Sequence, residues 1–158
     1  MKYSFDANKT VFSEFIQEDY FPVIIEFSNE ELNNLFIEFN YQDSDMFELS
    51  VNPNTFEIKR FSLTLCNHYA IKDASMKIPD YEEGALSFIG PTTTECSLFE
   101  VVVYNDGVEI RTSAEPASRH LKSGQLLFAL TDKGELASVL ITDLTPDNLN
   151  HIKTELSI

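Results

Sequence analysis

The sequence predicts an α+β fold in which a mainly antiparallel β-sheet, made of a meander and hairpins, is covered by a C-terminal α-helix. Three patterns predict it. Apolar and polar residues alternate with a period of two between Glu30 and Leu65, an Asn-Asp-Gly turn separates two short apolar runs, and an apolar stripe at helical spacing follows Thr145. With 158 residues, thirteen of them Phe, the chain can bury a sizeable core, and we expect a single domain over residues 1–158.

The first two strands of the meander are joined by a predicted loop at residues 42–46. This loop sets three apolar pairs opposite one another, Tyr41 with Phe47, Phe39 with Leu49, and Ile37 with Val51. In this register all six side chains lie on one face, and a slip of one residue would turn them to solvent. The other face carries Glu38, Asn40 and Glu48, and Asp43 and Asp45 lie at the tip of the loop.

The third strand follows a tight turn at Asn52-Pro53-Asn54-Thr55. Phe56 and Ile58 are then expected opposite Val51 and Leu49. At Lys59-Arg60 the parity of the apolar positions changes, and Phe61, Leu63 and Leu65 become the apolar set. An extra residue in one strand has this effect, so the sequence predicts a β-bulge at Lys59-Arg60.

The segments before the meander are shorter. Residues 2–6 predict an edge strand, and Val11, Phe12, Phe15 and Ile16 recur at the spacing of a short helix. A strand is expected from Val23 to Phe27. The capping-box spacing of residues 28–31 predicts a helical turn.

The second half of the chain begins with a long connection at residues 67–84 and a strand at residues 85–89. The pair Asp106-Gly107 predicts a hairpin between the apolar runs at 99–103 and 108–110, because both central residues of such a turn need positive φ. Turns centred one residue away stay open. Residues 112–123 are predicted as an irregular loop.

Residues 125–131 and 136–142 are almost continuously apolar, which predicts two central strands of a covered sheet. The turn between them is Asp132-Lys133-Gly134-Glu135. The C-terminal helix is expected to cover them, with Thr145 as its N-cap and Pro146 as its first residue. Its apolar stripe consists of Leu149, Ile152 and Leu156, and Leu144 is expected to pack on Leu149.

The charge of the chain is strongly negative and uneven. There are 26 Asp and Glu against 11 Lys and Arg, a net charge of −15, and residues 10–58 contain eleven acidic residues but no Lys or Arg. Such a surface repels nucleic acid and anionic membranes and speeds the encounter with a basic partner. Acidity that serves only to keep the protein in solution is the alternative.

No catalytic motif accompanies these acids. The sequence has no glycine-rich phosphate loop, nucleophile elbow or zinc pattern, and His68, His120 and His151 are not spaced to share a metal. We expect no catalytic residue, no metal and no cofactor. Cys66 and Cys96 make no disulfide framework, and no leader or membrane-spanning run occurs, so a cytoplasmic location is expected.

Acidic residues recur beside aromatic ones at three places. Aromatic anchors ringed by carboxylates suit a protein interface, where the rings supply buried area and the carboxylates pair with Lys or Arg. The alternative is that the rings are core and the acids are solvated. The candidate partner-binding residues are Glu18, Asp19 and Tyr20, then Glu38, Tyr41, Asp43, Asp45 and Glu48, and finally Asp80, Tyr81, Glu82 and Glu83.

In its size, its lack of catalytic motifs, its hairpin at Asn105-Asp106-Gly107 and its closing helix at Thr145, the chain resembles the small acidic immunity proteins of bacterial contact-dependent growth inhibition and polymorphic toxin systems. The resemblance includes no diagnostic motif and transfers no functional residue. It implies a protein that is not an enzyme and that blocks the active site of one cognate toxin, often a basic nuclease. We expect the free protein to be a monomer.

Two other classes of function are compatible with the sequence. Arg119, His120 and Lys122 form one local basic cluster, which suits the mouth of a ligand pocket or a small enzyme site between sheet and helix, or else a solvated loop. Alternatively, the almost continuous apolar strands form an oligomer interface in a structural or adaptor subunit.

Overall fold

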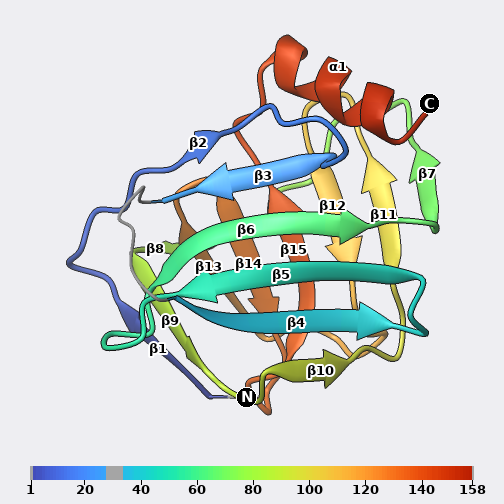
Figure 1. Cartoon of the computed structure of the whole chain (residues 1–158). Coiled ribbons are helices and arrows are strands. Elements are labelled where there is room, and N and C mark those ends of the chain that lie inside the picture. The colour runs from blue at the N-terminus through green and yellow to red at the C-terminus, as the bar shows by residue number, and fades with distance from the viewer. Residues whose placement is uncertain (1, 28–33, 158) are drawn as a thin grey trace.

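Residues 2–27 and 34–157 are described by the computed structural model, in which two β-sheets pack face to face and one helix closes an end of the pair (Figure 1). The strands of the front sheet run across those of the rear sheet, as in an orthogonal β-sandwich. Three short strand pairs are parallel and the others are antiparallel. The predicted α+β fold, mainly antiparallel with a C-terminal helix, is confirmed.

The front sheet has six strands in the order β10-β4-β5-β6-β3-β2. It contains the predicted meander as the neighbours β4, β5 and β6. The bounds are β2 Glu14–Phe15, β3 Val23–Glu26, β4 Leu35–Tyr41, β5 Asp45–Val51, β6 Ile58–Leu65 and β10 Thr93–Glu95.

The rear sheet has seven strands in the order β7-β11-β12-β15-β14-β13-β8. As their continuous apolar sequences predict, β14 and β15 lie in its middle. The bounds are β7 Tyr69–Ile71, β8 Glu82–Glu83, β11 Glu100–Val103, β12 Val108–Arg111, β13 Arg119–Ser123, β14 Leu126–Leu130 and β15 Leu136–Ile141.

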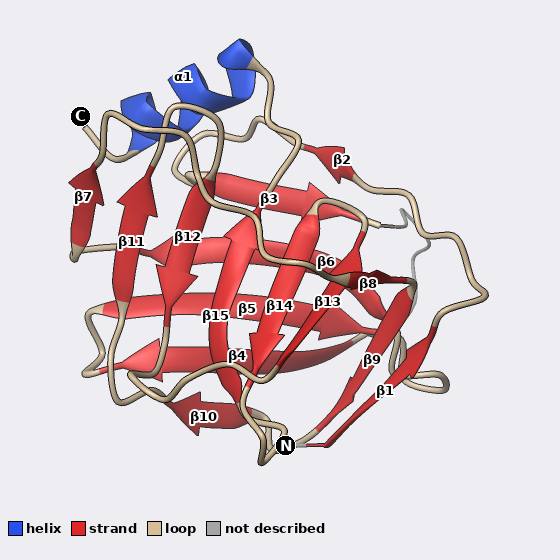
Figure 2. Cartoon of the chain, turned by 180° about the vertical axis from the view of Figure 1, so that it is seen from behind, coloured by secondary structure: helices blue, strands red, loops and turns tan. Residues whose placement is uncertain are grey.

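A separate antiparallel ribbon lies at one side of the sandwich (Figure 2) and consists of β1, Lys2–Asp6, and β9, Ala85–Ile89. Both strands were predicted from the sequence. Leu86 and Phe88 of β9 belong to the common core, and the Phe88 ring lies 5.2 Å from the Phe128 ring of β14. The ribbon therefore closes one edge of the space between the sheets.

Phenylalanine rings fill the space between the two sheets. Phe39 and Phe47 stack with their ring centroids 4.7 Å apart, and Phe47 also contacts Phe61 at 5.2 Å and Phe99 at 6.1 Å. The first three rings belong to the front sheet, whereas Phe99 directly precedes β11 of the rear sheet. None of the four is more than 2% exposed, so this cluster joins the two layers.

The pairing of β4 with β5 differs from the predicted register by two residues. Phe39 lies opposite Phe47 and Tyr41 opposite Asp45, because the connecting loop is shorter than expected. Gln42 and Asp43 both adopt positive φ, of 50° and 56°, and the Ser44 N–H donates to the Tyr41 carbonyl at 3.0 Å. A shift of two residues preserves the buried face but adds Asp45 to it.

The predicted β-bulge in β6 is confirmed. Ser50 lies opposite Arg60 whereas Val51 lies opposite Ile58, so Lys59 is the extra residue. Ile58 therefore faces Val51, and the predicted pairing of Ile58 with Leu49 is wrong. The turn at residues 52–55 is also present, where the Asn52 side chain accepts from the N–H groups of residues 54 and 55.

The central strands β14 and β15 of the rear sheet are apolar on both faces because both faces are covered. The front sheet covers its inner face, and the connection between β7 and β8 crosses its outer face (Figure 2). Met76 of that connection packs on Leu127 and Leu140. The Met76 N–H also donates to Asp106 Oδ1 at 2.7 Å, which ties the connection to the β11–β12 hairpin.

The β11–β12 hairpin is present, but its turn is centred on Asn105-Asp106, one residue before the Asp-Gly pair. The Tyr104 N–H donates to the Gly107 carbonyl at 2.8 Å, and neither central residue has positive φ. The glycine is favoured for another reason. A Cβ at Gly107 would displace the end of the Met76 side chain and lie 3.0 Å from the Ile141 carbonyl.

The helix α1, Pro146–Glu155, begins at the predicted cap. Thr145 Oγ1 accepts from the Asn148 N–H at 3.1 Å, and the Asn148 side chain accepts from the Thr145 N–H. Leu149, Ile152 and Leu156 are buried in the common core. The helix packs over one end of the sandwich (Figure 1), not across the rear sheet, because the front sheet occupies that face.

Two local predictions are wrong. Residues 11–16 contain no helix, and the strand β2 forms there instead by pairing with β3. Residues 119–123 are not an irregular loop, since they form β13 and pair along their whole length with β14. Tertiary pairing overrides the weak local signal in both cases. The helical turn predicted at residues 28–31 lies outside the described residues.

The ring cluster predicts the result of a core substitution. Phe47→Ala removes a ring that contacts three others, so we expect it to lower the free energy of unfolding by about 3–5 kcal/mol. Phe12→Ala is the matched control, because this ring is 81% exposed. Urea unfolding measures both. Equal losses for the two variants would contradict the described core.

Candidate functional site

The outward-pointing side chains of the front sheet form a surface that we call the outer face. Alternation along each strand sends every second residue away from the core. Across neighbouring strands, Glu38 of β4 lies opposite Glu48 of β5, and Glu48 lies opposite Ser62 of β6. The predicted outward position of Glu38 and Glu48 is therefore confirmed.

The carboxylates of Glu38 and Glu48 face each other without a neutralising partner among the described residues. Partial burial, followed by the charge of Glu38, raises the pKa of Glu48, and the nearby Arg60 opposes this only in part. Directly opposite like charges destabilise a sheet. The pair is thus a local excess of negative charge that a cation from outside the chain can relieve.

Arg60 is the basic side chain on this part of the outer face, and acids of the same chain already engage it. Its guanidinium lies 3.2 Å from Glu18 and 4.0 Å from Glu26. The structure thereby joins Glu18, from the first predicted cluster, to the surface that carries Glu38 and Glu48. Glu18 therefore lies on the same surface as the Glu38–Glu48 pair.

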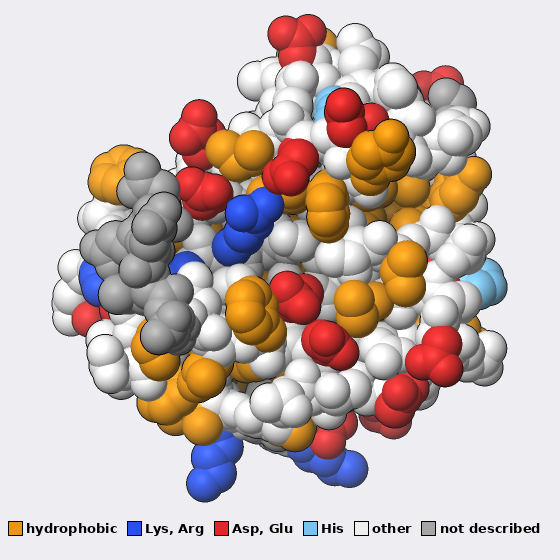
Figure 3. Space-filling model, viewed as in Figure 1, with side chains coloured by type: hydrophobic (Ala, Val, Ile, Leu, Met, Phe, Trp, Pro, Cys, Tyr) orange, Lys and Arg blue, Asp and Glu red, His pale blue; other side chains and the backbone are white. Residues whose placement is uncertain are grey.

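Apolar side chains are interspersed with the acids of the outer face. Phe36 is 52% exposed, and its position two residues before Glu38 places it on the same face. Leu65, half exposed, lies opposite Met46 at the far end of β5 and β6. Figure 3 shows acidic side chains at the middle of this face between hydrophobic ones, with further acidic side chains toward α1.

The turn at residues 18–21 presents Tyr20 to solvent in a strained conformation. Tyr20 is 88% exposed and has a φ of 72°, which is unfavourable for a bulky residue. The helix α1 holds this turn, because Glu155 accepts from the Tyr20 N–H at 3.0 Å and His151 Nε2 donates to the Phe21 carbonyl at 2.9 Å. Asp19 is exposed in the same turn. The helix therefore positions one end of the site.

Asp45 does not lie at an exposed tip, so its predicted surface position is wrong. It is completely buried, because the shortened hairpin turns it to the inner face. Its carboxylate accepts from the Ser44 hydroxyl at 2.7 Å, from the N–H groups of Asn67 and His68, and from His68 Nδ1 at 2.5 Å. Burial alone would raise the pKa of Asp45, but these bonds together lower it. Asp45 is an anchor for the segment that follows β6.

The same hairpin places the other two candidates differently. Tyr41 is on the inner side, packs against the core and meets the His68 ring edge-on at 5.8 Å. Asp43 is exposed at the tip, as predicted. Asp43 is therefore the more accessible of these two residues.

The third predicted cluster lies elsewhere on the molecule, at and before the edge strand β8 of the rear sheet. Glu82 pairs with Arg119 at 3.3 Å, and Lys122 lies 5.7 Å from the centre of the Tyr81 ring. Asp80 and Glu83 are exposed. The structure does not bring this cluster together with the outer face, and bases of the same chain partly neutralise it.

The basic residues of β13 are not at the mouth of a pocket between sheet and helix. The Arg119 guanidinium bonds to Glu82 and to the Tyr3 hydroxyl, at 3.3 and 3.2 Å, and Lys122 bonds to Asp143 at 3.0 Å. The positive charges of Arg119 and Lys122 are therefore already paired with carboxylates of the same chain. The interpretation of this cluster as the mouth of a ligand pocket or enzyme site is therefore not supported.

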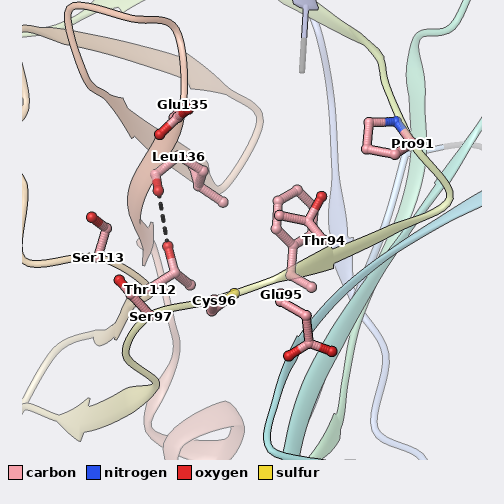
Figure 4. A pocket seen from close by; sticks show the side chains of 10 residues that line it. Pro91, Thr94, Glu95, Cys96, Ser97, Thr112, Ser113, Glu135 and Leu136 are labelled. Atoms are coloured by element: carbon pink, nitrogen blue, oxygen red, sulfur yellow. Dashed lines mark hydrogen bonds between the residues drawn. The ribbon is translucent and has the colours of Figure 1, made fainter.

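A cavity of about 320 Å³ lies between β10 and the ends of β12 and β15 (Figure 4). The Thr112 hydroxyl there is bonded to the Leu136 carbonyl at 3.1 Å, and the Glu95 and Glu135 carboxylates point away from each other. Burial, followed by the charge of Glu95, raises the pKa of Cys96 to about 11, so the thiol stays protonated at neutral pH. The lining offers neither a paired acid and base nor an activated nucleophile.

Within residues 2–27 and 34–157, no three His, Cys, Asp or Glu side chains are placed to hold a metal ion. No helix among the same residues is long and apolar enough to cross a membrane. Comparison with protein-family models finds no match, and no curated protein shows significant sequence similarity to the chain.

Several residues of the site were not among the sequence candidates. Phe36 and Glu26 could have been found, because the alternation that places Ile37 inward places Phe36 outward, and Glu26 lies between Ile25 and Phe27 of a predicted strand. The pairing of Arg60 with Glu18 has no sequence signal, since it depends on β3 lying beside β6.

The buried position of Asp45 predicts a pH-dependent loss of stability. Asp45→Asn loses two acceptor sites, so we expect a cost of about 2–3 kcal/mol at pH 7 in urea unfolding. Because the folded-state pKa lies below the ordinary 3.8, the contribution of Asp45 is complete above 3.8 and disappears as the pH falls through the lowered value. Asp43→Asn, at the exposed tip, is the control. If the difference in unfolding free energy between the wild type and Asp45→Asn did not shrink at low pH, this assignment would be contradicted.

The opposed carboxylates predict a gain of stability on neutralisation. Glu48→Gln removes the repulsion, so we expect about 0.5 kcal/mol higher stability at pH 7. The raised pKa of Glu48 means that the folded state binds a proton more readily, so the gain shrinks as the pH falls through that pKa. Glu38→Gln removes the same repulsion. The double variant should therefore gain less stability than the sum of the gains of the two single variants. Destabilisation by Glu48→Gln would show that the carboxylate is structural.

Proposed function

We propose that this protein is an acidic protein-binding inhibitor of the immunity-protein type, which neutralises a cognate basic toxin by covering its active site with the outer face. The observation that carries the proposal is the facing pair Glu38 and Glu48, held on a rigid sheet with no neutralising cation among the described residues. Exposed Phe36 and Tyr20 supply apolar anchors beside this charge.

The electrostatics favour a basic partner, and a nuclease in particular. A nuclease has a positive channel for its phosphate-rich substrate, and carboxylates on a stiff surface can occupy that channel in place of phosphates. The net charge of −15 adds long-range attraction, which speeds association at low salt. Binding by occlusion requires no catalytic residue, metal or cofactor in the inhibitor, and we assign none. We place the inhibitor in the cytoplasm, as a monomer until it meets the toxin.

The proposal predicts that a reading frame beside this gene encodes the cognate toxin domain, and the test uses that domain. The double variant Glu38→Lys, Glu48→Lys should lower the association rate constant at least about 10-fold and flatten its dependence on salt, because the variant removes the attracting charges. Stopped-flow mixing between about 50 and 200 mM salt measures the rates.

The matched control is Asp80→Lys, Glu83→Lys, which changes the net charge equally but lies at the edge of the rear sheet. We expect it to slow association only about 2–3-fold through net charge. A larger effect of this control than of the outer-face variant would assign binding to the third cluster. No complex with the wild-type protein would refute the proposed partner.

A further inference from the structure

The outer face contains a depression of about 310 Å³ beside the facing carboxylates. Glu48, Ser50, Arg60 and Ser62 line it from neighbouring strands, and Phe36 forms part of its wall. A volume of this order accommodates one long side chain of a partner. The depression is therefore suited to a single inserted group.

One acceptor atom in this depression lacks a donor within the described part of the chain. The side-chain oxygen of Asn34, which lines the depression, is buried and has no hydrogen-bond partner among those residues. Ser50, only 5% exposed, also lines the depression and points outward opposite Arg60. Buried polar groups are seldom left unpaired, so the Asn34 oxygen indicates a ligand that donates hydrogen bonds.

The charge around the depression selects a cation. Glu18, Glu26, Glu38 and Glu48 contribute four negative charges and Arg60 one positive charge, which leaves three negative charges in excess. The Arg60 guanidinium is directed to Glu18 and Glu26, so it offsets the charge of the Glu38–Glu48 pair only in part.

We propose that this depression binds the guanidinium group of an arginine on the basic partner, an assignment that rests on the proposed function. A guanidinium is planar, carries five N–H donors in a fixed fork and has no acceptor, which complements the Glu48 carboxylate and the unpaired Asn34 oxygen together. Its flat face can stack on the exposed Phe36 ring. A lysine ammonium is a point charge with three donors and matches this arrangement less well.

The probe for this assignment is N-acetyl-L-arginine methylamide, added to the ¹⁵N-labelled protein and followed by NMR. We expect saturable shifts confined to β4, β5 and β6, with a dissociation constant on the order of a few millimolar. The citrulline analogue has the same shape without the charge and should produce no saturable shift. The lysine analogue should bind at least about three-fold more weakly.

Two variants locate the binding. Glu48→Gln and Ser50→Ala should each weaken arginine binding at least about three-fold, while Glu83→Gln, which changes the net charge as Glu48→Gln does, should leave it unchanged. Wild-type-like spectra of the free variants establish that they are folded. Equal binding of arginine and lysine, no arginine binding at all, or equal loss in Glu83→Gln would overturn the assignment.

Arginine binding and toxin binding are measured separately, so the guanidinium site and the inhibitor function can fail independently. Arginine binding without any complex with the neighbouring toxin domain would keep the site and refute the inhibitor function. A toxin complex without arginine binding would keep the function and refute the guanidinium site.

Discussion

The structure depends on the alternation of side chains across the front sheet and on the aromatic contact that fixes it. Stacking of Phe39 on Phe47, and their packing against Phe99 of the rear layer, commits one face of β4–β6 to the core. Because the side-chain period of a strand is two, the intervening residues must point to solvent. The position of Glu38 opposite Glu48 is therefore a consequence of core packing, and it persists although the pair is mutually repulsive.

This arrangement concentrates unfavourable charge where a partner can relieve it. Some charges elsewhere on the molecule are matched internally, as Lys122 is with Asp143 and Arg119 with Glu82. The carboxylate of Asp45 accepts four hydrogen bonds in the interior. On the outer face, Glu38 and Glu48 lie directly opposite each other, and the nearby Arg60 is directed to Glu18 and Glu26. Sites that are strained in the free protein and relaxed in the complex are typical of binding surfaces.

Much of the fold is predictable from the sequence, because period and turn chemistry are local. The meander, the bulge at Lys59, the central strands and the cap at Thr145 all follow from short patterns. What fails depends on distant contacts. The shorter β4–β5 turn, which buries Asp45, arises from two non-glycine residues with positive φ, and the pairing of β13 with β14 removes the expected loop. The joining of Glu18 to the outer face also depends on strand order, which alternation does not specify.

The central claim is that the outer face is the surface that contacts the partner. Cross-saturation NMR on the deuterated protein in complex with the toxin domain tests it most directly, since it reports which amides lie at an interface. We expect strong saturation transfer to β4, β5, β6 and the turn at residues 18–21, and little to the rear sheet. Transfer concentrated on β8 and residues 80–83, or on the outer side of β12 and β15, would contradict it.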